Sequence, residues 1–183
     1  MNLTILNGGP TEADGSFALY CSTLSEKLGQ THTLQHFMLD KMETKQCIGC
    51  WNCWWKTPGI CTLVDDAEQA LHAVVHTDLL IFASPITAGF TSSTLKTFQD
   101  RLVSLLHPYI QLVKGECHHR KRYDKYPDFA LLLQKEPNTD AEDIEIITDI
   151  YKRLAVNFHT SLKYVWFTET TKMEDISHEL SHN

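Results

Sequence analysis

Short runs of apolar residues alternate along the chain with longer stretches in which apolar residues recur at helical spacing. An apolar run bounded by polar, glycine or proline residues is typical of a strand, whereas recurrence every three or four residues is typical of a helix. We therefore expect strands near residues 3–7, 31–39, 79–83, 129–133 and 162–167. Helices are expected near residues 16–28, 65–75, 92–106 and 140–158.

This alternation of strands and helices indicates an α/β fold. Residues 79–83 (LLIFA) contain no polar position, as in a strand covered on both faces of a parallel sheet. The simplest doubly wound arrangement of five parallel strands is the flavodoxin-like order 2-1-3-4-5. The 183 residues suffice for one hydrophobic core, so we expect residues 1–183 to form a single flavodoxin-like domain with a cysteine-rich loop at 47–61. Residues 107–127 are expected to be irregular and polar.

Composition narrows the classes of partner. The formal net charge is −7, which argues against nucleic acid, because a phosphate backbone requires a basic surface. The first 20 residues lack a basic start followed by an apolar run, and no stretch of about 18 apolar residues occurs. We therefore expect no secretion signal, no membrane partner and a cytoplasmic location.

Four of the six cysteines lie in one window. Cys47, Cys50, Cys53 and Cys61 have two, two and seven residues between them. In a reducing compartment such clusters are more often metal-binding or redox-active than disulfide-bonded. Three interpretations are open: thiolate ligands of an iron–sulfur cluster such as [4Fe–4S], a closed tetrahedral zinc site, or reduced thiols in a tryptophan-rich loop.

A second candidate site follows from the fold. Doubly wound sheets bind ligands outside the carboxyl ends of their strands, which here are followed by residues 7–16, 84–92 and 134–140. The first of these loops precedes a helix and offers small residues, hydroxyls and backbone N–H groups to a phosphate. An ordinary glycine-rich turn is the alternative. The candidate residues in this loop are Gly8, Gly9, Thr11, Gly15 and Ser16.

The basic segment before the fourth expected strand is interpreted as a solvated surface loop. Attraction of the phosphates of a nicotinamide dinucleotide is the alternative. The residues concerned are Lys114, His118, His119, Arg120, Lys121, Arg122 and Lys125.

Two motifs carry a resemblance to a known family. The pattern Ser-Pro-Ile-x-x-Gly at 84–89, followed by Leu-Lys-x-Phe-x-Asp-Arg at 95–101, resembles the flavodoxin-like NAD(P)H-dependent FMN reductases. The cysteine run, its fourth cysteine and Asp65-Asp66 resemble the iron–sulfur flavoprotein branch of that family. The resemblance covers roughly residues 1–105.

The resemblance implies an FMN cofactor, with its phosphate in loop 7–16 and its ring edge along the second loop. The residues of that second loop are Ser84, Pro85, Ile86, Thr87, Ala88 and Gly89. It also implies a [4Fe–4S] cluster near the flavin and a homo-oligomer, with NAD(P)H or another small electron donor and an acceptor that the sequence does not name. No catalytic side chain is identified, because the flavin supplies the redox chemistry.

We therefore expect an FMN-dependent oxidoreductase or electron-transfer flavoprotein. The competing hypothesis from another class is a noncatalytic metal- or cluster-binding module on a flavodoxin-like scaffold that has lost tight flavin binding.

Overall fold

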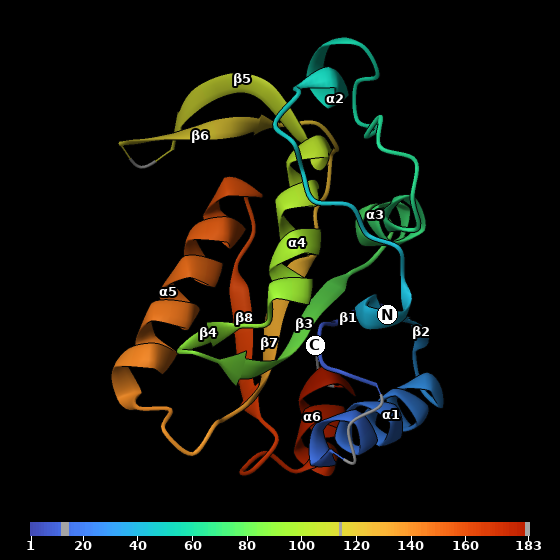
Figure 1. Cartoon of the computed structure of the whole chain (residues 1–183), viewed down its shortest axis with the longest axis vertical. Helices are drawn as coiled ribbons and strands as arrows, with labels where there is room; N and C mark the ends of the chain where they lie inside the picture. Colours follow the sequence, from blue (N-terminus) through green and yellow to red (C-terminus); the bar gives the residue numbers. More distant parts are fainter. Residues whose placement is uncertain (12–14, 114, 182–183) are drawn as a thin grey trace.

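A parallel β-sheet forms the centre of the molecule (Figure 1). The computed structural model describes residues 1–11, 15–113 and 115–181. The strands follow the order β2-β1-β3-β7-β8, which confirms the predicted flavodoxin-like order. Their bounds are β1 Asn2–Asn7, β2 Thr33–Met38, β3 Leu79–Thr87, β7 Asp128–Gln134 and β8 Leu162–Phe167. A short strand, β4 (Phe90–Thr91), pairs antiparallel with the end of β3.

Helices cover both faces of the sheet. One buried cluster joins the sheet to α3 (Ala67–Val75), α4 (Ser93–Arg101) and α5 (Ala141–Asn157). The other joins it to α1 (Ser16–Gly29) and α6 (Met173–Ser181). Successive residues of β3 alternate between these clusters, since neighbouring side chains of a strand point to opposite faces. Because helices cover both faces of the sheet, the strand at 79–83 is apolar at every position and does not alternate between apolar and polar residues.

Three single-turn elements complete the helical structure. They are η1 (Leu39–Lys41), α2 (Asn52–Trp55) and η2 (Leu102–Leu105). The helix expected at 92–106 is therefore shorter than predicted, because its last turn tightens into the 3-10 helix η2. Within the described residues, no helix is both long enough and apolar enough to span a bilayer.

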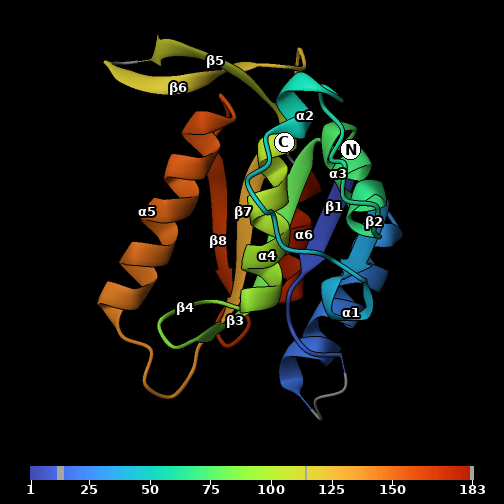
Figure 2. The same cartoon turned by 45° about the horizontal axis from the view of Figure 1, so that its top comes forward.

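The expectation of an irregular segment at 107–127 was wrong. The chain forms an antiparallel hairpin of β5 (Leu106–Val113) and β6 (Glu116–Lys121), which lies across the C-terminal end of α5 (Figures 1 and 2). A two-stranded hairpin can have polar residues on both faces, so its sequence shows no alternation of apolar and polar positions. Helix α6 was also not predicted.

Candidate functional site

The cysteine segment is a loop whose two ends are fastened together. The N–H of Lys45 donates to Oδ2 of Asp65 at 2.9 Å, and the N–H of Glu43 donates to Oδ2 of Asp66 at 2.8 Å. The N–H of Asp66 returns a bond of 3.0 Å to the carbonyl of Glu43. Carboxylates that accept backbone N–H groups in this way fix the base of the loop.

Arg101, at the end of α4, adds a buried ion pair to the base of the loop. Its Nη1 lies 2.6 Å from Oδ2 of Asp65, and both side chains are fully buried. The guanidinium also donates to the carbonyls of Lys45 and Leu63, at 2.8 and 3.4 Å. Arg101 therefore contacts the residues on both sides of the cysteine loop.

The environment of the ion pair shifts the pKa of both partners. Burial is the largest single influence and opposes the charge on each, but the hydrogen bonds and opposite charges around the pair together outweigh it. The pKa of Asp65 is held below its ordinary value by Arg101 and the N–H of Lys45, and the pKa of Arg101 is raised by Asp65 and by the nearby Cys61. Both groups are therefore charged at neutral pH.

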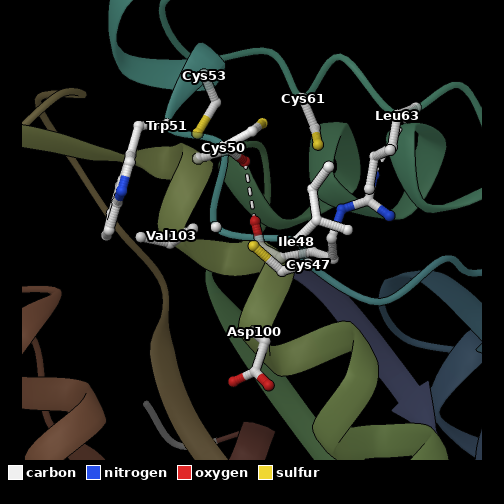
Figure 3. A pocket seen from close by; sticks show the side chains of 12 residues that line it. Cys47, Ile48, Cys50, Trp51, Cys53, Cys61, Leu63, Asp100 and Val103 are labelled. Atoms are coloured by element: carbon white, nitrogen blue, oxygen red, sulfur yellow. Dashed lines mark hydrogen bonds between the residues drawn. The ribbon is translucent and has the colours of Figure 1, made fainter.

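All four clustered cysteines line one cavity of about 340 Å³ (Figure 3). The remaining walls come largely from the loop itself and from the end of α4 with η2. These other lining residues are Ile48, Gly49, Trp51, Leu63, Asp100, Arg101, Val103 and Ser104. The structure thus places these four cysteines around one cavity, while Cys21 and Cys117 lie on α1 and β6.

The four thiols influence one another. The pKa of Cys53 is raised by burial and further by the proximity of Cys61, Cys47 and Cys50. All four are free thiols. Among the described residues, no three His, Cys, Asp or Glu side chains are close enough together to hold a metal ion.

Trp51 lines the cavity, and Trp54 packs against Trp51. Trp51 has a left-handed backbone conformation, with φ of 60°, and immediately precedes the short helix α2. Its ring lies 4.4 Å from that of Trp54, whose Nε1 donates to the carbonyl of Val103 at 3.2 Å. Trp55, in contrast, is 73% exposed. Trp54 therefore attaches the loop to the chain segment after α4, and Trp55 faces solvent.

The glycines of loop 7–16 pack against the protein itself. A Cβ added to Gly8 would lie 2.5 Å from Cβ of Leu95, and one added to Gly9 would lie 2.4 Å from the ring of Phe17. Their N–H groups donate to the carbonyl of Ala83 and to Oδ1 of Asn7, both at 2.9 Å. Tight packing therefore explains both glycines without a ligand.

Further along the same loop, Thr11 donates from its N–H and its hydroxyl to the carboxylate of Asp40. Residues 12–14, the middle of the predicted phosphate loop, lie outside the described residues. Gly15 precedes α1, and no side chain of the described residues caps the start of this helix. The hydroxyl of Ser16 accepts a hydrogen bond of 2.6 Å from Gln134, which lies at the end of β7.

The second predicted loop is largely strand. Residues 84–87 belong to β3, contrary to the expectation that the strand ends near residue 83, because they pair with β7 and β4. Only Ala88 and Gly89 form the turn to β4, with φ of 51° and 75°. A Cβ on Gly89 would lie 2.6 Å from Oδ1 of Asp143 at the start of α5. The glycine is thus required by the turn and by its neighbour.

The two candidate sites lie at opposite ends of α4. Before its first turn, Ser92 donates to the carbonyl of Gly8 at 2.7 Å. Asp100 and Arg101, at its end, line the cysteine cavity. Nine residues of helix separate Ser92 from Arg101, which corresponds to roughly 13 Å. Within one chain, Gly8 and the cysteine cavity therefore lie at opposite ends of this helix.

Comparison with curated proteins relates the chain to flavoproteins. It is 28% identical over 109 residues to an iron–sulfur flavoprotein of Clostridioides difficile (strain 630), which covers 58% of this chain and 48% of that protein. It is also 28% identical over 101 residues to an iron–sulfur flavoprotein of Methanocaldococcus jannaschii, covering 55% and 51%. The predicted resemblance to iron–sulfur flavoproteins is confirmed. The chain spans about half the length of these two iron–sulfur flavoproteins. No family model matches it.

Solved structures support the fold. An FMN-dependent NADH-azoreductase from Bacillus anthracis, in complex with FMN, is similar with a TM-score of 0.63 and 11% identity, covering 98% of this chain and 93% of that one. The Trp repressor binding protein from Bacillus subtilis is similar with a TM-score of 0.56 and 18% identity, covering 91% and 85%. At these identities the likeness shows the flavodoxin-like fold alone.

Proposed function

We propose that this chain is an FMN-dependent oxidoreductase or electron-transfer flavoprotein whose four clustered cysteines hold a [4Fe–4S] cluster. The observation that carries the proposal is the single cavity lined by Cys47, Cys50, Cys53 and Cys61. The names of the iron–sulfur flavoproteins of C. difficile and M. jannaschii support the same assignment. NAD(P)H is the proposed electron donor, in keeping with the NADH-dependent azoreductase that shares the fold.

The spacing of the four cysteines favours a cluster over zinc. Four thiolates are soft ligands that suit both. A structural zinc ion requires all four sulfurs at about 2.3 Å from one point. The spacing of the first three cysteines, with two residues between each pair and a more distant fourth cysteine, agrees with the pattern of cuboidal iron–sulfur sites. A cubane cluster binds each thiolate at a different iron, so it accommodates sulfurs that line a wider cavity.

The surroundings of the cavity suit a redox cluster. Ile48, Leu63 and Val103 provide apolar walls beside the four cysteines. Arg101 brings a positive charge beside Cys61, which offsets the negative charge that thiolate ligands gather in one place. When bound, the cluster would supply single-electron transfer. The contribution of the protein is to hold the four sulfurs and to position the Arg101–Asp65 pair.

For FMN, we propose that the phosphate lies at the start of α1. Among the residues that the structure describes, this helix has no side-chain cap and no acidic residue in its first turn, so its first N–H groups are suited to an anion. Gly15 and Ser16 lie at this terminus. The flavin ring would lie toward residues 84–89, with Gln134 nearby. When bound, FMN supplies hydride and electron transfer.

A second candidate function is favoured by one observation. The N–H groups of Gly8, Gly9 and Thr11 already donate to protein acceptors. In this conformation they offer nothing to a phosphate. This favours the competing function, a noncatalytic cluster-binding module on a flavodoxin-like scaffold.

The visible spectrum of protein purified without oxygen separates these functions. A flavoprotein with a cluster shows the two sharp bands of oxidised flavin over the broad absorption of iron–sulfur. A cluster-binding module shows the broad absorption alone, even after FMN is added. Zinc or free thiols give a colourless protein, which would contradict the proposed cluster.

A further inference from the structure

Arg101 has one more hydrogen-bond donor than its partners in the protein use. An arginine side chain carries five N–H groups. Nη1 donates to Oδ2 of Asp65 and to the carbonyl of Lys45, and Nη2 donates to Oδ1 of Asp65 and to the carbonyl of Leu63. The remaining donor, on Nε, has no acceptor among the residues that the structure describes.

This unused donor is out of reach of bulk water, because only 1% of Arg101 is exposed. Buried donors in folded proteins are almost always paired, since an unpaired N–H loses its hydrogen bonds with water and gains none in return. An unpaired N–H in the interior therefore points to an acceptor that a bound group supplies or strengthens.

The cysteine cavity offers such an acceptor. Arg101 lines this cavity together with Cys61 and the three other clustered cysteines. Against the effect of burial, the nearby Cys61 helps Asp65 to raise the pKa of Arg101. A neutral thiol is a weak acceptor, whereas a thiolate that binds a metal carries the negative charge that a guanidinium N–H recognises. Because Asp65 and the two carbonyls take up both Nη atoms, Nε is the nitrogen left for the cavity.

We propose that Nε of Arg101 donates a hydrogen bond to the thiolate of Cys61 when the cluster is bound, and that this contact raises the reduction potential of the cluster. This role rests on the cluster proposed above for the four cysteines. Hydrogen bonds to sulfur and the local net charge are among the factors that set the potential of iron–sulfur clusters. Reduction adds one electron, and so one negative charge, beside Cys61. A fixed cationic donor stabilises the reduced form more than the oxidised form.

Asp65 holds the guanidinium in place and also opposes its effect. Its carboxylate accepts from Nη1 at 2.6 Å and from Nη2 at 3.2 Å, so the arginine is fixed at two points. The negative charge of Asp65 cancels much of the positive charge of Arg101 at longer range. The influence of Arg101 therefore depends on the direct contact with Cys61, and Asp65 limits how strong that influence is.

The midpoint potential of the reconstituted cluster tests this contact. A redox titration followed by the electron paramagnetic resonance signal of the reduced cluster measures it separately from any flavin. Arg101→Met/Asp65→Leu removes the donor without changing the net charge of the protein. We expect this double variant to bind the electron about tenfold more weakly, which lowers the potential by about 59 mV.

Lys27→Met/Glu174→Leu is the matched control. It removes an ion pair between α1 and α6, which pack on the other face of the sheet from α4. Its affinity for the electron should change by less than about twofold, because exposed charges at a distance are screened by salt. Iron and sulfide analysis shows that each titrated variant holds a complete cluster.

Asp65→Asn separates the contact from a general loosening of the loop. This variant keeps the guanidinium and removes the charge that compensates it, so we expect the potential to rise. Loosening of the loop would move the potentials of Asp65→Asn and of the double variant in the same direction. If only one of these two variants binds a cluster, the sign of its shift decides.

Two failures can be told apart. Wild-type protein that binds no reducible cluster would remove the proposed function and this role of Arg101 together. A complete cluster whose potential is unchanged or raised in Arg101→Met/Asp65→Leu, or lowered in Asp65→Asn, would overturn the role of Arg101 alone. A shift of equal size in Lys27→Met/Glu174→Leu would overturn it as well.

Discussion

Nη1 of Arg101 donates a hydrogen bond of 2.6 Å to Oδ2 of Asp65, and neither side chain has contact with solvent. This bond joins the end of α4 to the base of the cysteine loop. A buried charge pair contributes little net stability, but removing one partner leaves an uncompensated charge in the interior. The pair therefore makes the position of the loop depend on both residues.

We predict that Arg101→Met lowers the free energy of unfolding by about 3 to 5 kcal/mol, because Asp65 would be left buried without a counter-charge. Urea denaturation of the metal-free protein measures this. The double variant Arg101→Met/Asp65→Leu should recover most of the loss, since both charges are removed. A loss below about 1 kcal/mol for Arg101→Met would contradict the role of the pair.

We predict that Cys21 is unreactive in the native protein. Burial raises its pKa to about 12, so almost no thiolate exists at neutral pH, and the side chain is inaccessible. Cys50 and Cys117 are exposed and should be alkylated first. Peptide mapping after brief treatment of metal-free protein with iodoacetamide checks the order. If Cys21 is modified as fast as Cys117 without denaturant, the prediction is wrong, and the core around α1 is accessible to the reagent.

We predict that Gly89→Val destabilises the fold even without flavin. The residue has φ of 75°, which β-branched side chains avoid, and its Cβ would meet Asp143. A loss of about 2 to 3 kcal/mol is expected in the absence of flavin. Gly89→Asn is the control for backbone conformation, since asparagine tolerates positive φ, and it should cost less. Equal stability of Gly89→Val and wild type would contradict the turn geometry.

We predict that Ser16→Asp weakens FMN binding by about tenfold or more, because it places a carboxylate beside the proposed phosphate position. Riboflavin, which lacks the phosphate, should bind to the variant and to wild type with the same affinity. Quenching of flavin fluorescence measures both. If Ser16→Asp weakens both flavins equally, the phosphate does not lie at the start of α1.

The central sheet could be predicted because its strands are short apolar runs covered on both faces. Leu79 to Ala83 gave an unambiguous signal, and the burial of all five residues explains it. The hairpin could not be predicted in the same way, because Glu116–Lys121 is almost wholly polar. The end of β3 was misplaced because Pro85 resembles a loop residue, although it pairs with Gln134 near the carboxyl ends of β3 and β7.

The candidate site was only partly predictable. The spacing of the cysteines identified the four thiols as a group, because residues that are close in the sequence stay close in space in any fold. The Arg101–Asp65 pair joins residues 36 positions apart, and sequence alone does not place them in contact. One signal was available: Arg101 follows Phe98 by three residues and so falls on the buried side of α4. A charged residue at such a position requires a buried partner.

The most direct test of the central claim is the iron and sulfide content of the protein after anaerobic reconstitution. The proposed [4Fe–4S] cluster predicts close to four of each per wild-type chain. Replacing any one of Cys47, Cys50, Cys53 or Cys61 by serine should sharply reduce both, because a hydroxyl is a poor ligand for a soft metal. Cys21→Ser and Cys117→Ser should retain them. Equal iron and sulfide in all seven proteins, or none in any, would contradict the assignment of these cysteines as one set of ligands.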